Sequence, residues 1–148
     1  LLIGLAITPI REIFGLNLVR FRRVVGLAAF TTIALHLLSW AWLDVAFDPA
    51  TMWKDISRRP YITIGMAAFI LLIPLAVTST NAMIRRLGPK AWNRLHKLVY
   101  LIAILGGLHF LLLKKTIQAE PLIYLGLAVI LIGWRLVPRR KAAVPARG

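Results

Sequence analysis

Long hydrophobic runs, separated by short polar segments, make up most of the chain. A helix that crosses a membrane needs about 20 mainly apolar residues, because each residue advances it by about 1.5 Å. The pattern predicts four complete membrane-spanning helices and the end of a truncated one, at 24–43, 61–84, 92–113, 121–137 and, for the truncated helix, 1–10. The predicted fold is therefore all-α, a polytopic transmembrane helical bundle.

The span at 92–113 carries charge only near its beginning. Its stretch from 98 to 113 is uncharged, whereas Arg94 and Lys97 lie in its first turns. Long basic side chains can extend along a helix until the charge reaches the membrane surface. We therefore expect one continuous helix that carries both His96 and His109.

Composition agrees with a membrane location and excludes several classes of protein. Hydrophobic residues make up 59% of the chain and the mean hydropathy is +0.78, whereas soluble domains usually have about 45–50% apolar residues. A net charge of +14 can indicate a nucleic-acid partner. Here the basic residues lie between hydrophobic spans, as they do in the loops of membrane proteins. We therefore expect membrane lipid as a partner of the chain and do not expect nucleic acid. The chain has no cysteine, which excludes iron–sulfur clusters, thiolate-ligated haem and disulfides.

Charge is distributed unevenly among the segments between the spans. The net charges of five successive segments are +3, 0, +5, +1 and +5, for 11–23, 44–59, 85–97, 114–120 and 135–148. Cytoplasmic segments of membrane proteins carry the excess of lysine and arginine. The alternation predicts that the first, third and last segments are cytoplasmic, including a basic tail at 138–148.

The three histidines of the chain, His36, His96 and His109, all lie on predicted spans. A single intramembrane histidine can simply bond a neighbouring helix, but neutral imidazole is also a common axial ligand of haem iron. The spans that carry His36 and His109 run in the same direction, which places these residues roughly 18 and 26 Å from the cytoplasmic ends. Both lie in the outer half of the membrane, so we expect them to hold one haem as a pair.

His96 belongs to the inner half, because it precedes His109 by about 20 Å along an ideal helix. A partner on the span of His36 would lie at a similar depth, and the residue found there is Arg22. Arg22 could oppose His96, bind a haem propionate, or extend to the lipid surface. His96 is expected to serve an inner haem, FMN or a quinone, so the number of haems is left at one or two.

One geometric difficulty concerns the expected helix that carries His96 and His109. The two histidines are 13 residues apart in sequence. On an ideal helix this separation places them about 140° apart around the helix axis. Local overwinding at Gly106 and Gly107, or helix tilt, would reduce the difference. We expect these two glycines mainly to allow close packing against another helix.

Electron transfer is the chemistry that this arrangement favours. Two axial histidines fill the coordination of haem iron and leave no position for oxygen or substrate. No Walker motif or Gly-rich dinucleotide motif is present, and Ser39, Ser57 and Ser79 have no credible histidine and acid partners. The alternative from another class is a haem-free transporter or assembly subunit whose histidines join helices.

Five segments of the chain resemble the MsrQ (YedZ) family of the wider ferric reductase-like transmembrane group. They are TPIRE, RFRRVVGLAAFTTIALH, SRRPYITIG, PLAVTSTNAMIRRLG and WNRLHKLVYLIAILGGLHF. The resemblance covers nearly the whole chain and implies a single transmembrane haem domain, 1–148, that is truncated at its N-terminus. Related oxidases carry histidine pairs on two helices and hold two stacked haems. The position that matches their inner histidine is Arg22 here, which departs from that pattern.

The resemblance also implies partners. A member of this family would pass electrons through b-type haem across the bacterial inner membrane, from a cytosolic flavin reductase or the quinone pool. The acceptor would be a periplasmic molybdopterin subunit like MsrP, which reduces methionine sulfoxide. Outer loops of about 16 and 7 residues leave no room for a catalytic domain, so an electron-transfer subunit is expected rather than a catalytic one. A ferric or quinone reductase-type haem subunit is the alternative within redox chemistry.

Overall fold

The computed structural model describes residues 1–114 and 118–137, and within them it contains helices and no strand. Four helical segments are long and apolar enough to cross a membrane, namely Val19–Asp44, Pro60–Val77, Asn81–Leu113 and Ala119–Leu136. The expected all-α bundle with four complete spans is therefore confirmed. The expected basic tail at 138–148 lies outside the described residues.

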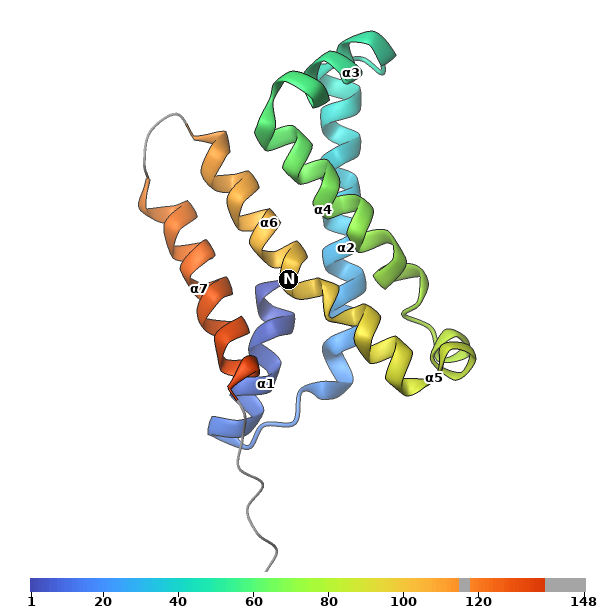
Figure 1. Cartoon of the computed structure of the whole chain (residues 1–148), viewed down its shortest axis with the longest axis vertical. Helices are drawn as coiled ribbons and strands as arrows, with labels where there is room; N and C mark the ends of the chain where they lie inside the picture. The colour runs from blue at the N-terminus through green and yellow to red at the C-terminus, as the bar shows by residue number, and fades with distance from the viewer. Residues whose placement is uncertain (115–117, 138–148) are drawn as a thin grey trace, which may run out of the picture.

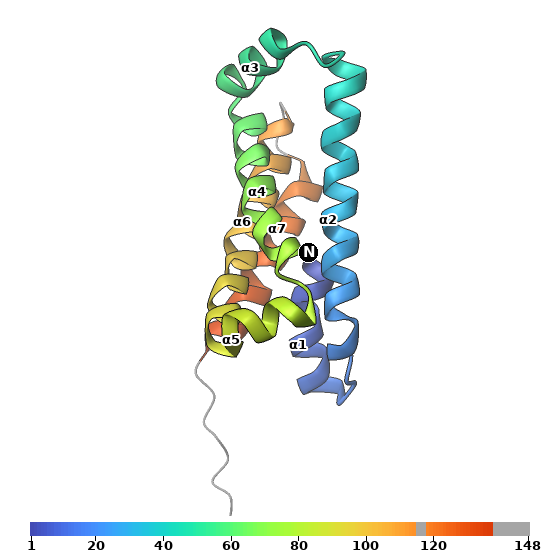
Figure 2. The same ribbon diagram turned by 90° about the vertical axis from the view of Figure 1, so that its right-hand side faces the viewer.

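Most of the helices run roughly along the long axis of the molecule (Figure 1). Five of them form the bundle, namely α1 (Leu2–Phe14), α2 (Arg22–Ser39), α4 (Pro60–Val77), α6 (Leu98–Leu113) and α7 (Ala119–Leu136). α6 packs against α4 and α7, and α1 packs against α7 and α2. α2 stands on one side of the bundle, opposite α4, α6 and α7 (Figure 2). None of the residues Arg22–Ser39 is buried, so α2 is only loosely covered by its neighbours.

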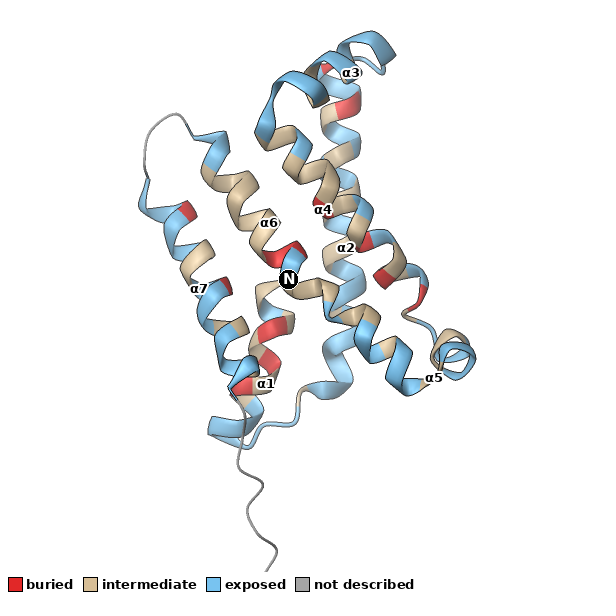
Figure 3. Cartoon of the chain, viewed as in Figure 1, coloured by how far each residue is buried: buried red, intermediate tan, exposed pale blue. Residues whose placement is uncertain are grey.

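Two small clusters of buried residues hold the bundle together. One joins α4 to α6 through Ala68, Leu72, Leu75 and Ile102. The other joins α1, α6 and α7 through Leu5, Ala103 and Ala128. Most of the other described residues are exposed (Figure 3). On membrane-spanning helices such exposed apolar side chains face lipid tails, so the small size of the core is expected.

The first helix is longer than expected. It extends from Leu2 to Phe14 and ends at Gly15, whose φ of 70° is the left-handed conformation common at helix ends. Glu12 therefore lies in α1 and not in the connecting segment. Its carboxylate accepts a hydrogen bond of 2.9 Å from Nε1 of Trp134 on α7, which ties the two helices together.

The span expected at 61–84 ends earlier, at Val77. The hydroxyls of Thr78 and Ser79 donate 2.6 Å hydrogen bonds to the carbonyls of Pro74 and Leu75. Side chains of this type can satisfy the last carbonyls of a helix and so end it. Thr80 then caps the next helix, α5 (Asn81–His96), by accepting a bond from the backbone N–H of Met83.

The helix expected at 92–113 begins earlier and is bent. α5 contains a non-helical residue, Gly88, with φ 77°, which is followed by Pro89. A turn at Lys97 then separates α5 from α6, so His96 ends one helix and His109 lies on the next. Gly106 and Gly107 remain α-helical, so the alternative of local overwinding is not observed. The expected close packing is found at Gly107, where an added Cβ atom would lie 2.7 Å from Leu125 of α7.

The segment between α2 and α4 contains a helix that the hydropathy pattern does not predict, α3 (Pro49–Arg58). Asp48 caps it by accepting a 2.8 Å hydrogen bond from the backbone N–H of Thr51. Pro49 occupies the first helical position, where its missing N–H costs nothing. α3 lies at one end of the molecule, whereas α5, the beginning of α2 and the end of α7 lie at the other (Figure 1).

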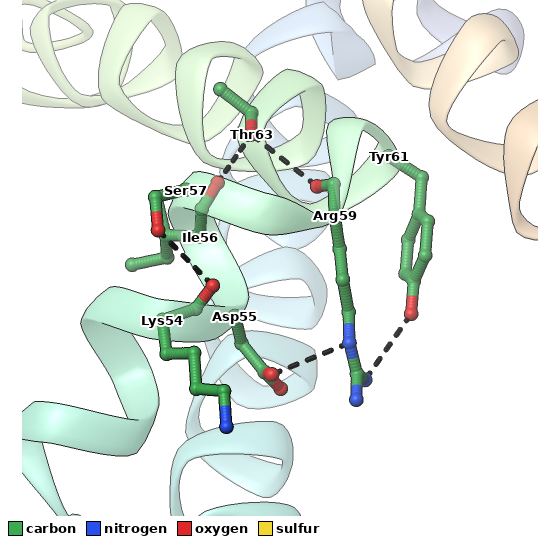
Figure 4. Close-up of polar contacts among 7 residues, drawn as sticks. All are labelled: Lys54, Asp55, Ile56, Ser57, Arg59, Tyr61 and Thr63. Atoms are coloured by element: carbon green, nitrogen blue, oxygen red, sulfur yellow. Dashed lines mark hydrogen bonds and ion pairs between the residues drawn. The ribbon is translucent and has the colours of Figure 1, made fainter.

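The corner between α3 and α4 is held by polar contacts (Figure 4). The Arg59 guanidinium forms an ion pair of 3.3 Å with Asp55 and donates a 3.4 Å hydrogen bond to the Tyr61 hydroxyl. The Thr63 hydroxyl donates to the backbone carbonyls of Ile56 and Arg59. These contacts fix the first turn of α4.

Candidate cofactor-binding site

His36 on α2 and His109 on α6 face each other. Their ring centres are 6.3 Å apart and the ring planes are inclined by 76°. A metal–imidazole bond is about 2 Å long, so two nitrogens on opposite sides of one metal ion lie about 4 Å apart, with each ring centre about 1 Å further back. The observed separation therefore fits two imidazoles that bind one metal ion between them.

The tautomer of the neutral His109 imidazole is set by α4. Its Nδ1 lies 2.7 Å from the backbone carbonyl oxygen of Tyr61. A carbonyl can only accept a hydrogen bond, so Nδ1 must carry the hydrogen and Nε2 keeps its lone pair. Histidines that bind metals usually donate their other N–H in this manner.

An apolar groove of about 680 Å³ lies between α2 and α6, and neither His36 nor His109 is among the residues that line it. Thr32, which lines it, precedes His36 by one helical turn, whereas His109 is directed toward α4. Ile33, Phe110 and, from α7, Tyr124 also line this groove. Its volume lies within the range of about 300–1,000 Å³ that is usual for cofactor sites.

A second hollow, the basic cavity, lies at the end of the molecule that holds α5, and its volume is about 690 Å³. Its apolar part is formed by Phe30, Leu72 and Leu75. Among the described residues no acidic side chain lines it, whereas five basic ones do: Arg20, Arg22, Arg23, Lys97 and Arg135. Such a charge excess beside apolar walls attracts anionic groups.

His96 also lines the basic cavity. Its ring stacks on Trp92, with centres 3.7 Å apart, and its Nδ1 lies 3.1 Å from the Trp92 carbonyl oxygen. Trp92 is itself held by a 2.8 Å hydrogen bond from Nε1 to the Thr78 carbonyl. Nε2 of His96 is buried and has no hydrogen-bond partner. Because buried polar atoms normally have partners, this nitrogen is available to a ligand.

Two arginines of the basic cavity, Arg22 and Arg135, are anchored to α1. Arg22 donates a 2.6 Å hydrogen bond to the Thr8 hydroxyl. Arg135 donates to the backbone carbonyls of Gly4 and Leu5, at 3.2 and 2.9 Å, and its Nε is buried without a partner. Their guanidinium groups can therefore bind an anion without first being ordered.

The structure thus brings the predicted site residues together as two groups. His36 lies beside His109, and Arg22 lines the same cavity as His96. In the described part of the chain, no group of three or more histidine, aspartate or glutamate side chains could hold a metal ion by itself.

Sequence reasoning missed two residues of the basic cavity. Arg135 belongs by sequence to the last basic segment, 135–148, but it lies on α7 and turns toward α1. A tryptophan at the beginning of a span, such as Trp92, is typical of the membrane surface, but Trp92 stacks on His96. The spacing of Trp92 and His96, one helical turn apart, could have indicated the stack. No sequence signal indicates the contact of Arg135 with α1.

The fold and these two sites define a polytopic helical membrane protein with room for cofactors between α2 and the other helices. The family model for the ferric reductase like transmembrane component matches residues 1–107. Two curated relatives carry the name protein-methionine-sulfoxide reductase heme-binding subunit MsrQ. The one from Caulobacter vibrioides is 54% identical over 97% of this chain and 69% of its own length. The one from Rhodospirillum rubrum is 51% identical over 99% of this chain and 73% of its own length.

The chain therefore belongs to the MsrQ family, within the ferric reductase-like transmembrane group. No solved structure is significantly similar to it.

Proposed function

We propose that this chain is the haem-binding membrane subunit of a methionine sulfoxide reductase system and carries electrons through b-type haem. The observation that supports this most is the pair of facing imidazoles, His36 and His109, with ring centres 6.3 Å apart. The names of the MsrQ relatives support the choice of haem and of the reductase system. A haem held by two histidines supplies one-electron transfer and has no open coordination position.

In this proposal the chain supplies the ligands and fixes their orientation. His36 and His109 would hold one haem, and the Tyr61 carbonyl would orient one of the two imidazoles. The Tyr61 carbonyl keeps the proton of His109 on Nδ1, so Nε2 remains a ligand.

His96 and the basic cavity would serve a second cofactor. The free Nε2 of His96 is a potential ligand, and Arg22 and Arg135 can pair with carboxylate or phosphate oxygens. The positive charge of this cavity favours an anionic group, such as a haem propionate or the phosphate of FMN, over a neutral quinone. We therefore propose that this site binds a second haem or FMN, in preference to a quinone.

We further propose that the chain lies in the bacterial inner membrane with the basic end toward the cytoplasm, because cytoplasmic segments carry the excess of basic residues. Electrons then enter near His96 and leave near the pair His36 and His109. The donor is a cytosolic flavin reductase or the quinone pool, and the acceptor is a periplasmic molybdopterin subunit like MsrP.

Visible spectroscopy of the purified protein tests the haem and its ligands. The wild-type protein should show a sharp Soret band and split bands on reduction. His36→Ala and His109→Ala should each abolish the same haem, because loss of either imidazole leaves it with one axial ligand. Gly126→Ala is the control, since an added methyl group at Gly126 meets no atom within 4 Å.

Three other results would contradict parts of the proposal. Full haem content in either histidine variant would refute the pairing. Correctly folded wild-type protein without haem would favour the transporter or assembly subunit. Reoxidation of the reduced protein by ferric chelates or quinones, but not by the molybdopterin subunit with methionine sulfoxide, would favour a ferric or quinone reductase-type subunit.

A further inference from the structure

We propose that α4, which contributes no candidate ligand, sets the reduction potential of the haem held by His109. Two groups of α4 contact the imidazole of His109: the Tyr61 carbonyl accepts its Nδ1–H, and Gly65 leaves room for the ring. We call these two groups the seat. The inference rests on the proposed function in one respect, namely that His109 is a haem ligand. Gly65 is in this view a positioning residue.

The seat leaves room for the imidazole only because residue 65 is glycine. Gly65 follows Tyr61 by one helical turn, so both lie on the face of α4 that meets α6. A Cβ atom at Gly65 would lie 2.7 Å from Nδ1 of His109 and 2.9 Å from Cε1. Carbon atoms at van der Waals contact are about 3.5–4.0 Å apart. Any side chain at this position would therefore displace the ring or separate α4 from α6.

The carbonyl of the seat is held firmly. Tyr61 lies in the first turn of α4, directly after Pro60, and its hydroxyl accepts the bond from Arg59 described above (Figure 4). Arg59 is paired in turn with Asp55 of α3. The Tyr61 carbonyl has two lone pairs, so it can accept from His109 while it takes part in the helix.

The seat has a chemical consequence for the ligand. A hydrogen bond from Nδ1–H to a carbonyl moves electron density toward Nε2 and makes the imidazole a more basic ligand. A more basic ligand stabilises the ferric state relative to the ferrous state, and so lowers the reduction potential. Crowding by a methyl group at Gly65 would lengthen this hydrogen bond and raise the potential.

The test compares Gly65→Ala with Gly126→Ala in the haem-loaded protein, by redox titration and by electron paramagnetic resonance of the ferric haem. Gly65→Ala should move the potential of the His109 haem to more positive values and change its resonance spectrum, or remove that haem from an otherwise folded protein. Gly126→Ala should behave as the wild type. Unchanged potential, spectrum and haem content in Gly65→Ala would overturn the inference.

His109→Ala, measured in parallel, separates this inference from the proposed function. Full haem content in His109→Ala would refute the proposed function. Loss of haem in His109→Ala, together with no effect of Gly65→Ala, would refute only the seat.

A measurement on the wild-type protein covers the case in which Gly65→Ala does not fold. Nitrogen-15 resonance of labelled histidine should show a hydrogen on Nδ1 of His109 that exchanges slowly with water, both with and without haem. A rapidly exchanging hydrogen, or the other tautomer, would overturn the seat.

Discussion

In both His96 and His109, Nδ1 lies against a backbone carbonyl oxygen. The surroundings of the other ring nitrogen, Nε2, differ between the two residues. Nδ1 bonds the Trp92 carbonyl in one case and the Tyr61 carbonyl in the other. His109 faces a second imidazole, whereas Nε2 of His96 is buried and lacks a partner. An unsatisfied buried polar atom costs about 1–3 kcal/mol. The unpaired Nε2 therefore costs stability in the cofactor-free protein, and such a cost is common at binding sites.

Replacement of His96 by leucine should expose this cost. His96→Leu removes the unpaired nitrogen and keeps an apolar side chain against Trp92, so the free energy of unfolding of the cofactor-free protein should rise by about 1 kcal/mol. Thermal unfolding in detergent would measure the change. The same variant should lose whatever cofactor the basic cavity binds.

His96→Gln is the matched control for this experiment, because it keeps a polar group at the site. Its unfolding temperature should not rise. Equal stabilisation by His96→Gln and His96→Leu would show that the unpaired nitrogen is not the cause.

α3 depends on its cap, because it is a short helix and none of the residues Pro49–Arg58 is buried. Asp48 accepts hydrogen bonds from the side chain and backbone of Thr51, and these bonds lower the pKa of the Asp48 carboxyl. The cap is therefore complete above the ordinary pKa of an aspartate and is lost as the pH falls through the lowered value.

We expect the α3 amides to exchange hydrogen faster as the pH drops below the pKa of Asp48, after correction for the intrinsic rates. Asp48→Ala should give fast exchange at every pH, since it removes the acceptor. Asp48→Asn keeps an acceptor that does not titrate, so its protection should not depend on pH. A pH dependence that persists in Asp48→Asn would assign the effect to another group.

The whole molecule has two chemically different ends. Basic residues gather at the end with α5 and the basic cavity, and α3 lies at the other (Figure 1). Loosely covered α2 forms one wall of both the basic cavity and the apolar groove. The two hollows therefore lie against the same helix, one of them at the basic end.

Single cysteines can test the proposed orientation, because the natural chain has none. Ala50→Cys lies in α3 and Asn17→Cys lies between α1 and α2, and both positions are exposed. In intact cells stripped of the outer membrane, a membrane-impermeant thiol reagent should label Ala50→Cys only. Asn17→Cys should react only after the inner membrane is opened. The reverse pattern would refute the orientation.

The number of spans, their approximate positions and the closeness of His36 to His109 could all be predicted from the sequence. These features depend on hydrophobic length, on charge and on depth along helices of known rise, which are local properties. The predicted ends of the helices were less accurate where polar side chains end a helix by bonding to its backbone. Thr78 and Ser79 end α4 within an uncharged run, and the pair Gly88 and Pro89 marks a break that hydropathy does not detect.

Only the tertiary structure decided how the helices meet around the histidines. Gly65 looks like any glycine in an apolar helix until α6 places His109 against it. Arg135 looks like part of a basic tail until α7 packs on α1. Hydrophobic pattern is a property of each helix alone, whereas such contacts depend on the direction and rotation of two helices at once. The sequence therefore determined which segments are long and apolar enough to span a membrane, because that is a local property, and packing decided which of their side chains meet in the two candidate sites.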